Sequence, residues 1–260
     1  MHQKEREHAA QCSTTLVTEA GWELHNYEGP MLVKVLNNVC KLNTPEARYD
    51  LISIPTFRGL SADAKRVKLL ISNIALAVDV HSAERVWLLH HSHYFSDEVY
   101  YRLRREFAQR FPMLSLSTER VPRMKEGREP SRRLVVTCMD FRLHHAGGLQ
   151  GMFTGKSAWL TYPGAAFAGV DQATETVFFS DLDRVLDQEA VTELTLVSHT
   201  DCAKYAAKYS WRNAKEERKK LADDLRFVAS RISSRYAHLT VLCAIAVIKN
   251  GAVKELVPVS

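Results

Sequence analysis

The chain has 260 residues, of which 46% are hydrophobic and 25% are charged, and its formal net charge at pH 7 is +5. This composition is typical of an ordinary globular protein with one large or two small domains. No apolar run reaches the roughly 18 residues that a membrane-spanning helix needs. Acidic residues interleave with the basic ones, and no basic and aromatic stripe suits a nucleic acid. We therefore expect neither a membrane nor a nucleic acid as partner.

The cysteines and the first residues indicate the cellular setting. The five cysteines are an odd number, and the opening segment Met1–His8 is polar and charged, without the apolar stretch of a signal peptide. Cysteines in a chain of this kind more often bind a metal than form disulfides. We therefore expect a cytoplasmic protein.

Apolar runs alternate with helical patterns along the chain, which predicts an α/β fold built on a parallel sheet. In the first half, the predicted strands are 31–36, 50–55, 85–90 and 113–118, and the predicted helices are 61–79 and 95–110. The segment 121–131 is rich in proline, glycine and charge and predicts a hinge. In the second half, the predicted strands are 133–138, 157–162, 192–198, 238–248 and 252–257, and the predicted helices are 171–187 and 203–233.

The two halves resemble each other. An offset of 108 residues places Pro55 over Pro163, and the apolar positions that follow agree as far as the next predicted strand. A longer offset of 125 residues aligns 113–118 with 238–243, because the second half carries an insertion in its charged helical region. A repeat of this length predicts a duplicated α/β unit. We expect the two units to be 1–128 and 129–260.

Three potential metal ligands follow two of the predicted strands. Cys138 ends one apolar run, and His199 and Cys202 end another. The carboxyl ends of parallel strands meet at one edge of a sheet, so these side chains should lie close together. Two thiolates and one imidazole suit Zn²⁺, and a fourth position without a protein ligand is typical of catalytic zinc. The alternatives are buried cysteines beside a core histidine, or a closed structural zinc site with Asp140 as its fourth ligand.

A polar pair accompanies the first ligand. Asp140 and Arg142 are two residues apart just after the strand, close enough for a charge-assisted contact between carboxylate and guanidinium. Such a contact would keep Asp140 ionised and oriented beside the metal. The spacing therefore predicts a pair that supports chemistry at the open position.

The pattern Cys-x-Asp-x-Arg, followed by His-x-x-Cys some sixty residues later, resembles the signature of the β-class carbonic anhydrases. The resemblance runs from about Pro130 to the C-terminus. It implies the parallel-core fold of that family, Zn²⁺ as cofactor, and reversible hydration of CO₂ to bicarbonate. It also implies the roles of five residues: Cys138, His199 and Cys202 as zinc ligands, and Asp140 and Arg142 as the catalytic dyad.

The departures from the family pattern concern the substrate pocket. Tyr162–Ala166 stands where the family carries an Asn-Ala-Gly type of turn, and Phe141 replaces a small residue. We place Phe141, Gly164 and Ala165 in the pocket, with Gly164 allowing a close backbone approach. A pocket narrowed by Phe141 also suits COS or CS₂, so a COS/CS₂ hydrolase is an alternative. A non-catalytic, zinc-stabilised interaction module is another, because Ala203 replaces the glycine common after the second cysteine.

The first unit lacks the ligand set. The repeat places Tyr94 opposite Cys202, and Asn37 follows the strand matched to 134–138, so we expect this unit to bind no zinc. The family resemblance implies dimers whose clefts lie at the subunit interface. We therefore expect 1–128 to act as an internal partner, which makes the chain a pseudo-dimer, and further homo-oligomers stay open.

Two groups of histidines have either a structural or a functional interpretation. His90-His91-Ser92-His93 includes the residue that the repeat places opposite His199, and we expect it to be a metal-free relic. His144-His145 follows Arg142 and is either a solvent-exposed loop or a proton shuttle near neutral pH.

Overall fold

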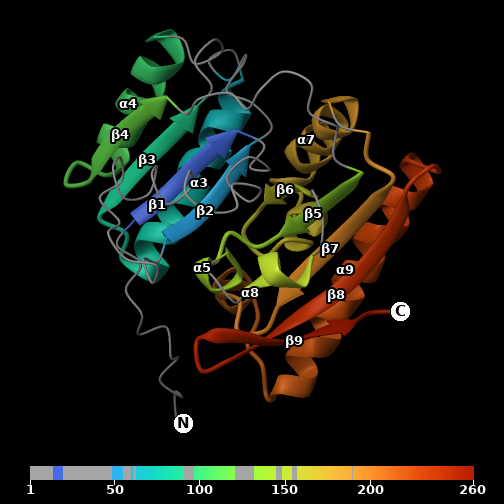
Figure 1. Ribbon diagram of the computed structural model, residues 1–260. Helices are drawn as coiled ribbons and strands as arrows, with labels where there is room; N and C mark the ends of the chain where they lie inside the picture. Colours follow the sequence, from blue (N-terminus) through green and yellow to red (C-terminus); the bar gives the residue numbers. More distant parts are fainter. Residues whose placement is uncertain are drawn as a thin grey trace.

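The computed structural model of the protein contains two β-sheets that lie side by side (Figure 1). The predicted α/β fold with parallel sheets is confirmed. The structure describes residues 14–19, 49–54, 60, 63–90, 97–120, 132–144, 148–153, 157–188 and 190–260. The predicted strand 31–36 and hinge 121–131 lie outside these residues.

The first sheet has the strand order β2-β1-β3-β4, and all its pairs are parallel. Its strands are β1 (Thr14–Glu19), β2 (Tyr49–Ile54), β3 (Arg85–His90) and β4 (Ser115–Arg120), and its helices are α3 (Ala64–His81) and α4 (Asp97–Arg110). Helix α3 begins after Asp63, whose side chain accepts a hydrogen bond from the Arg66 N–H at 3.1 Å. This N-cap satisfies a helix-end donor, so a short Asp side chain fixes where α3 starts.

The second sheet has the order β6-β5-β7-β8-β9, in which only β8 and β9 are antiparallel. Its strands are β5 (Arg133–Thr137), β6 (Ser157–Thr161), β7 (Glu193–His199), β8 (Thr240–Lys249) and β9 (Ala252–Pro258). Its helical segments are α5 (Phe141–His144), η3 (Leu149–Met152), α6 (Phe167–Val170), α7 (Glu175–Gln188), α8 (Ala203–Lys208) and α9 (Ala214–Arg235). The central strands β5 and β7 are buried nearly throughout, as their continuous aliphatic runs predict.

The two sheets pair their strands in the same register. Tyr49 and Arg85 flank β1 as Ser157 and Glu193 flank β5, which is the offset of 108 residues found in the sequence. The pairings of β3 with β4 and of β7 with β8 reproduce the offset of 125 residues. The sequence repeat and the strand pairing therefore agree.

Two predicted elements differ from the structure. Strand β1, which pairs with β2 and β3, is Thr14–Glu19, so the strand matched to 134–138 is not 31–36. By register, Glu19 and not Asn37 stands opposite Cys138. The helix predicted over 203–233 is two helices, because the Asn213 side chain accepts hydrogen bonds from the N–H groups of Lys215 and Glu216 and starts α9.

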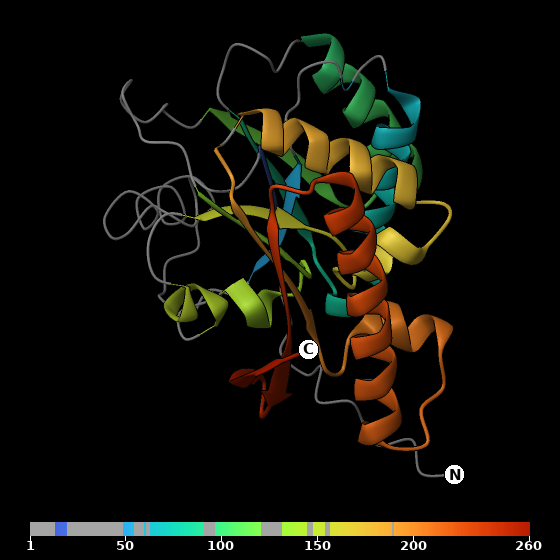
Figure 2. The same cartoon turned by 90° about the vertical axis from the view of Figure 1, so that its right-hand side faces the viewer.

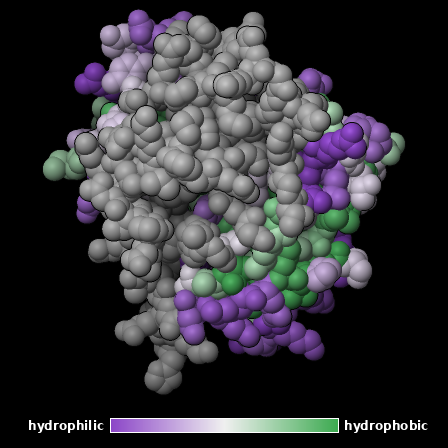
Figure 3. Space-filling view, viewed as in Figure 1, coloured by the Kyte–Doolittle hydropathy of each residue, from purple (hydrophilic) through white to green (hydrophobic). Residues whose placement is uncertain are grey.

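Helices cover the second sheet unequally. Figure 2 shows α7 and α9 on one side of this sheet and α5 on the other. Helix α9 packs on β7 and β8 through its buried residues Leu221, Leu225, Val228 and Ile232. Leu242 of β8 points to the other face of the sheet and is 46% exposed, and Figure 3 shows apolar side chains gathered over this part of the molecule. Within the described residues, no helix is long and apolar enough to cross a membrane.

A buried polar network joins the two units. Arg66 of α3 forms an ion pair with Asp181 of α7, and the Tyr162 hydroxyl, just after β6, donates to the same carboxylate. Arg66 also donates to Ser180 Oγ at 3.1 Å. A second link runs between the sheets, where the Leu51 N–H donates to the Met139 carbonyl at 3.1 Å. Buried ion pairs require such complete partnering, so these contacts fix how α3 lies against the second unit.

Candidate metal centre

Cys138, His199 and Cys202 lie together at the carboxyl ends of β5 and β7. The two Sγ atoms and a ring nitrogen of His199 all lie within 4.8 Å of one another, and all three residues are buried. The neighbouring parallel strands β5 and β7 place their ends at the same edge, which is why residues sixty apart in the chain meet here.

His199 turns its Nε2 atom toward this site. Its Nδ1 lies 2.8 Å from the Thr200 carbonyl, an acceptor only, so Nδ1 carries the proton and donates it. Nε2 is then free to bind a metal, and this buried atom has no hydrogen-bond partner among the described residues. A backbone carbonyl that fixes the tautomer is the usual arrangement of a metal-binding imidazole.

The two thiol groups differ in their surroundings. Burial raises the pKa of Cys138 well above that of an ordinary thiol, and its Sγ accepts a hydrogen bond from the Gly164 N–H at 3.2 Å. The pKa of Cys202 is lowered, first by its hydrogen bond with Cys138 and further by the backbone N–H groups of Tyr205 and Lys204. Two close sulfurs, an orphaned imidazole nitrogen and N–H donors to sulfur form a donor set that fits Zn²⁺.

The close approach of Gly164 to Cys138 requires glycine. Gly164 adopts φ +74°, and a Cβ there would lie 2.8 Å from Phe167 Cβ and 3.2 Å from the Tyr205 ring. Neither backbone nor space suits a larger residue. The turn after β6 therefore contributes a backbone N–H to the metal centre.

Asp140 and Arg142 form the contact that their spacing predicts. Arg142 Nε donates to Asp140 Oδ1 at 2.9 Å, and Nη2 donates to Oδ2 at 2.6 Å, which is a bidentate pair. Burial disfavours the charged guanidinium, but the bonds to Asp140 and Asp201 outweigh it and raise the pKa of Arg142. Asp140 Oδ2 lies 3.8 Å from His199 Nε2, so the carboxylate faces the ligand group.

Sequence reasoning missed Asp201, which holds Arg142 from the other side, and Glu217, which holds Asp201. Arg142 Nη1 donates to Asp201 Oδ2 at 3.0 Å, and Nη2 donates to the Asp201 carbonyl at 3.2 Å. Asp201 has φ 59°, a left-handed conformation that Asp tolerates better than most residues, and its N–H donates to Glu217 Oε1 at 2.7 Å. The one available signal was the position of Asp201 between two ligands.

A narrow cleft beside the metal centre has a wall from the first unit. Leu76, Ala77 and Val80 of α3 line it, together with Met139 and Ala203 and with Cys138, Asp140, Cys202 and Lys204. Its volume of about 10 Å³ accommodates one water-sized molecule. Helix α3, which belongs to the first sheet, therefore lies against the candidate metal centre at the edge of the second sheet.

The residues predicted for the substrate pocket lie in different places. Gly164 and Ala165 are buried in the turn after β6 and are not among the described residues that line the narrow cleft. The side chain of Phe141 lies outside the described part of the chain.

The predicted histidine groups are described only in part. The prediction that His144 lies in a solvent-exposed loop is wrong. Its side chain is buried, and its Nε2 lies 2.6 Å from the Cys138 carbonyl. The short helix α5 turns this side chain back toward the end of β5. His145, His91 and Tyr94 lie outside the described residues.

Comparison with known proteins gives a structural likeness but no matching family. No protein-family model matches the chain, and no curated protein matches it. Among solved structures, the chain is similar to a carbonic anhydrase from Glaciozyma antarctica, with 16% sequence identity and a TM-score of 0.34. The match covers 51% of this chain and 83% of that chain. The assignment of the metal centre rests on its own geometry.

Proposed function

We propose that the protein is a zinc enzyme of carbonic anhydrase type that catalyses the reversible hydration of CO₂ to bicarbonate. The observation that carries the proposal is the buried, bidentate pair of Asp140 and Arg142 beside two cysteines and one histidine. A closed structural zinc site gains nothing from such a pair, whereas a carboxylate held beside an open fourth position can accept a hydrogen bond from a water molecule there. The ligands would be Cys138, His199 and Cys202.

Zn²⁺ held by these three residues would supply Lewis acidity, which makes a bound water molecule more acidic. Asp140 Oδ2, which lies 3.8 Å from His199 Nε2, would accept a hydrogen bond from a water molecule beside the ligands. Arg142 occupies both carboxylate oxygens and keeps Asp140 ionised, so the carboxylate is held back from closing the site as a ligand.

The chemistry of the cleft lining, rather than its volume of about 10 Å³, favours a small, uncharged substrate. Leu76, Ala77 and Val80 provide an apolar wall, and Met139 lies among the other lining residues. Apolar walls exclude bulk water and strengthen the electrostatic contacts inside. We extend the proposal to the first unit, which acts as an internal partner by supplying this wall from α3.

Stopped-flow CO₂ hydration and metal analysis of the purified full chain test the proposal. We expect about one zinc ion per chain and measurable hydration, with kcat/KM at least about 100-fold lower in Asp140→Asn. Asp183→Asn is the matched control, since Asp183 pairs with Arg235 on the surface. Equal and negligible rates in wild type and Asp140→Asn would refute an enzyme and leave a zinc-stabilised module. Sulfide release from COS or CS₂ without CO₂ hydration would instead indicate the hydrolase.

A further inference from the structure

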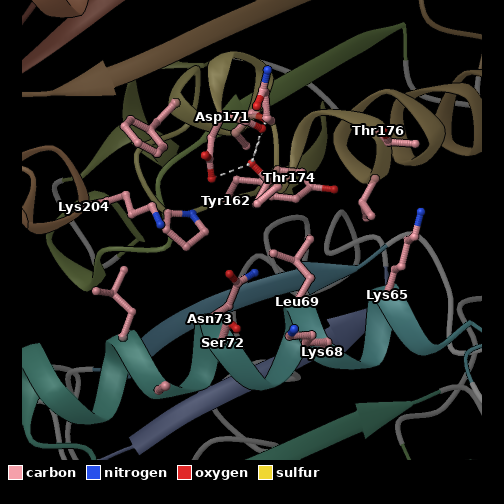
Figure 4. Close-up of a pocket in the computed structure, with 18 of the residues that line it drawn as sticks. Lys65, Lys68, Leu69, Ser72, Asn73, Tyr162, Asp171, Thr174, Thr176 and Lys204 are labelled. Carbon is pink, nitrogen blue, oxygen red and sulfur yellow. Dashed lines mark hydrogen bonds between the residues drawn. The ribbon is translucent and has the colours of Figure 1, made fainter. Parts of the chain in front are cut away.

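A second, larger cavity adjoins the metal cleft. It has a volume of about 530 Å³ and lies between α3 and the segment from the end of β6 to α7 (Figure 4). Leu76 and Lys204 line both spaces, whereas none of the three metal-binding side chains is among the described residues lining the larger one. Its volume is in the range of small-molecule sites. The cavity is therefore a separate space beside the metal centre.

Asn73 gives this cavity a polar group. The residue is only 6% exposed. Figure 4 shows its side chain rising from α3 into the cavity. An amide in the wall of a cavity can donate and accept hydrogen bonds with a ligand, which a leucine of similar volume cannot. A carboxamide kept here points to a ligand that hydrogen-bonds to it.

Positive charge surrounds the same space. Lys65, Lys68 and Lys204 line the cavity against two aspartates, Asp79 and Asp171. Asp171 is already used within its own turn, where Oδ2 accepts from Thr174 Oγ1 at 3.4 Å. Figure 4 shows Lys204 near one end and Lys65 near the other. The balance of charge favours an anion.

Apolar side chains form much of the remaining wall, beside the polar residues Ser72, Gln172, Thr174 and Thr176. Leu69 and Leu76 come from α3, and Phe167 and Val177 come from the opposite side. Lys204 Nζ lies 5.2 Å from the centroid of the Phe167 ring, so a cation and an aromatic face meet in one wall. A hydrated inorganic anion would leave these apolar walls unused.

We propose that this cavity binds an organic carboxylate with an apolar body. The carboxylate lies between Lys204 and the amide of Asn73, and the apolar body packs against Leu69 and Val177. This site goes beyond the proposed function, since its ligand takes no part in CO₂ hydration and does not require the metal. Because Lys204 and Leu76 line both spaces, the bound carboxylate would sit on the α3 side of the metal cleft.

Calorimetric titration of the full metal-containing chain with hexanoate tests the site, with hexanamide as the uncharged analogue. We expect hexanoate to bind, and hexanamide to bind at least about tenfold more weakly. Asn73→Leu and Lys204→Met should each raise the Kd for hexanoate about tenfold or more. Lys208→Met is the matched control, because Lys208 also faces the Phe167 ring at 5.0 Å but is not among the described lining residues, and its Kd should stay within about twofold.

Three results would overturn the site. These are no hexanoate binding up to about 10 mM, equal binding of hexanamide, and a Kd that is unchanged in Asn73→Leu and Lys204→Met. A Kd unchanged in Asn73→Leu but raised in Lys204→Met would also overturn the site and would indicate hexanoate bound in the metal cleft, since Lys204 lines both spaces and Asn73 is not among the described residues that line the metal cleft. Urea denaturation of Asn73→Leu, expected to show the same single cooperative transition as wild type, shows that lost binding is not lost folding. Failure of CO₂ hydration leaves every one of these outcomes unchanged.

Discussion

Replacing Arg142 by methionine tests whether the dyad holds Asp140 in place. The two side chains are 2% and 4% exposed, and Arg142 Nη2 lies 2.6 Å from Asp140 Oδ2, so water cannot take over from the guanidinium. Leaving one member of a buried ion pair without its partner costs about 3–5 kcal/mol. We therefore expect Arg142→Met to lower the free energy of unfolding by about 3–5 kcal/mol at pH 7.

The double variant Asp140→Asn/Arg142→Met separates lost charge pairing from lost packing. Its destabilisation should be smaller than the sum of the single effects by about 1.5–3 kcal/mol, because no buried carboxylate is left unpaired; Asp201, which also loses Arg142, is 39% exposed and can be hydrated. Urea denaturation of all four proteins with zinc measures this coupling. Arg235→Met is the control, since its pair with Asp183 is 49% and 37% exposed and should contribute at most about 1 kcal/mol. Strictly additive effects, or a loss in Arg142→Met no larger than in the control, would refute the reasoning.

Three further predictions concern the turn after β6, the buried network and the role of the first unit. Gly164→Ala should lower the free energy of unfolding by about 1–3 kcal/mol in urea, because its Cβ would lie 2.8 Å from Phe167 Cβ, and should reduce zinc retention on dialysis. Burial raises the pKa of Asp181 to about 6 from 3.8, so its contribution to stability is present below pH about 4 and is lost as the pH rises through about 6. The stability of wild type relative to Asp181→Asn should therefore fall by about 3 kcal/mol between pH 4 and 7, and a flat or rising difference would contradict this. The separate segment 129–260 should lose CO₂ hydration, because it lacks α3 and Arg66, and a stable, monomeric and fully active segment in size exclusion and stopped-flow assays would argue against the pseudo-dimer.

The sequence predicts those parts of the candidate metal centre that come from the second half of the chain alone. Cys138 and His199 follow continuous aliphatic runs, and parallel strands carry such residues to a common edge. Asp140 and Arg142 are two residues apart, so one turn of the chain brings their side chains into contact. This contact does not depend on the packing of another helix or strand. The repeat was visible because the two sheets keep one register.

The parts missed by sequence reasoning depend on long-range packing or on single caps. The wall formed by Leu76 and Ala77 belongs to the first unit, and no local pattern says which helix will face the metal. Strand β1 is a run rich in threonine that an aliphatic search passes over. The break between α8 and α9 depends on Asn213, since its cap outweighs the helical pattern around it.

Exchange of ¹⁸O between CO₂ and water, followed by mass spectrometry, is the most direct measurement of the central claim. The zinc-containing full chain should accelerate loss of the label well above the uncatalysed rate, and Asp140→Asn should remove nearly all of that acceleration. Exchange at the uncatalysed rate by a folded chain that holds one zinc ion would contradict the proposed function.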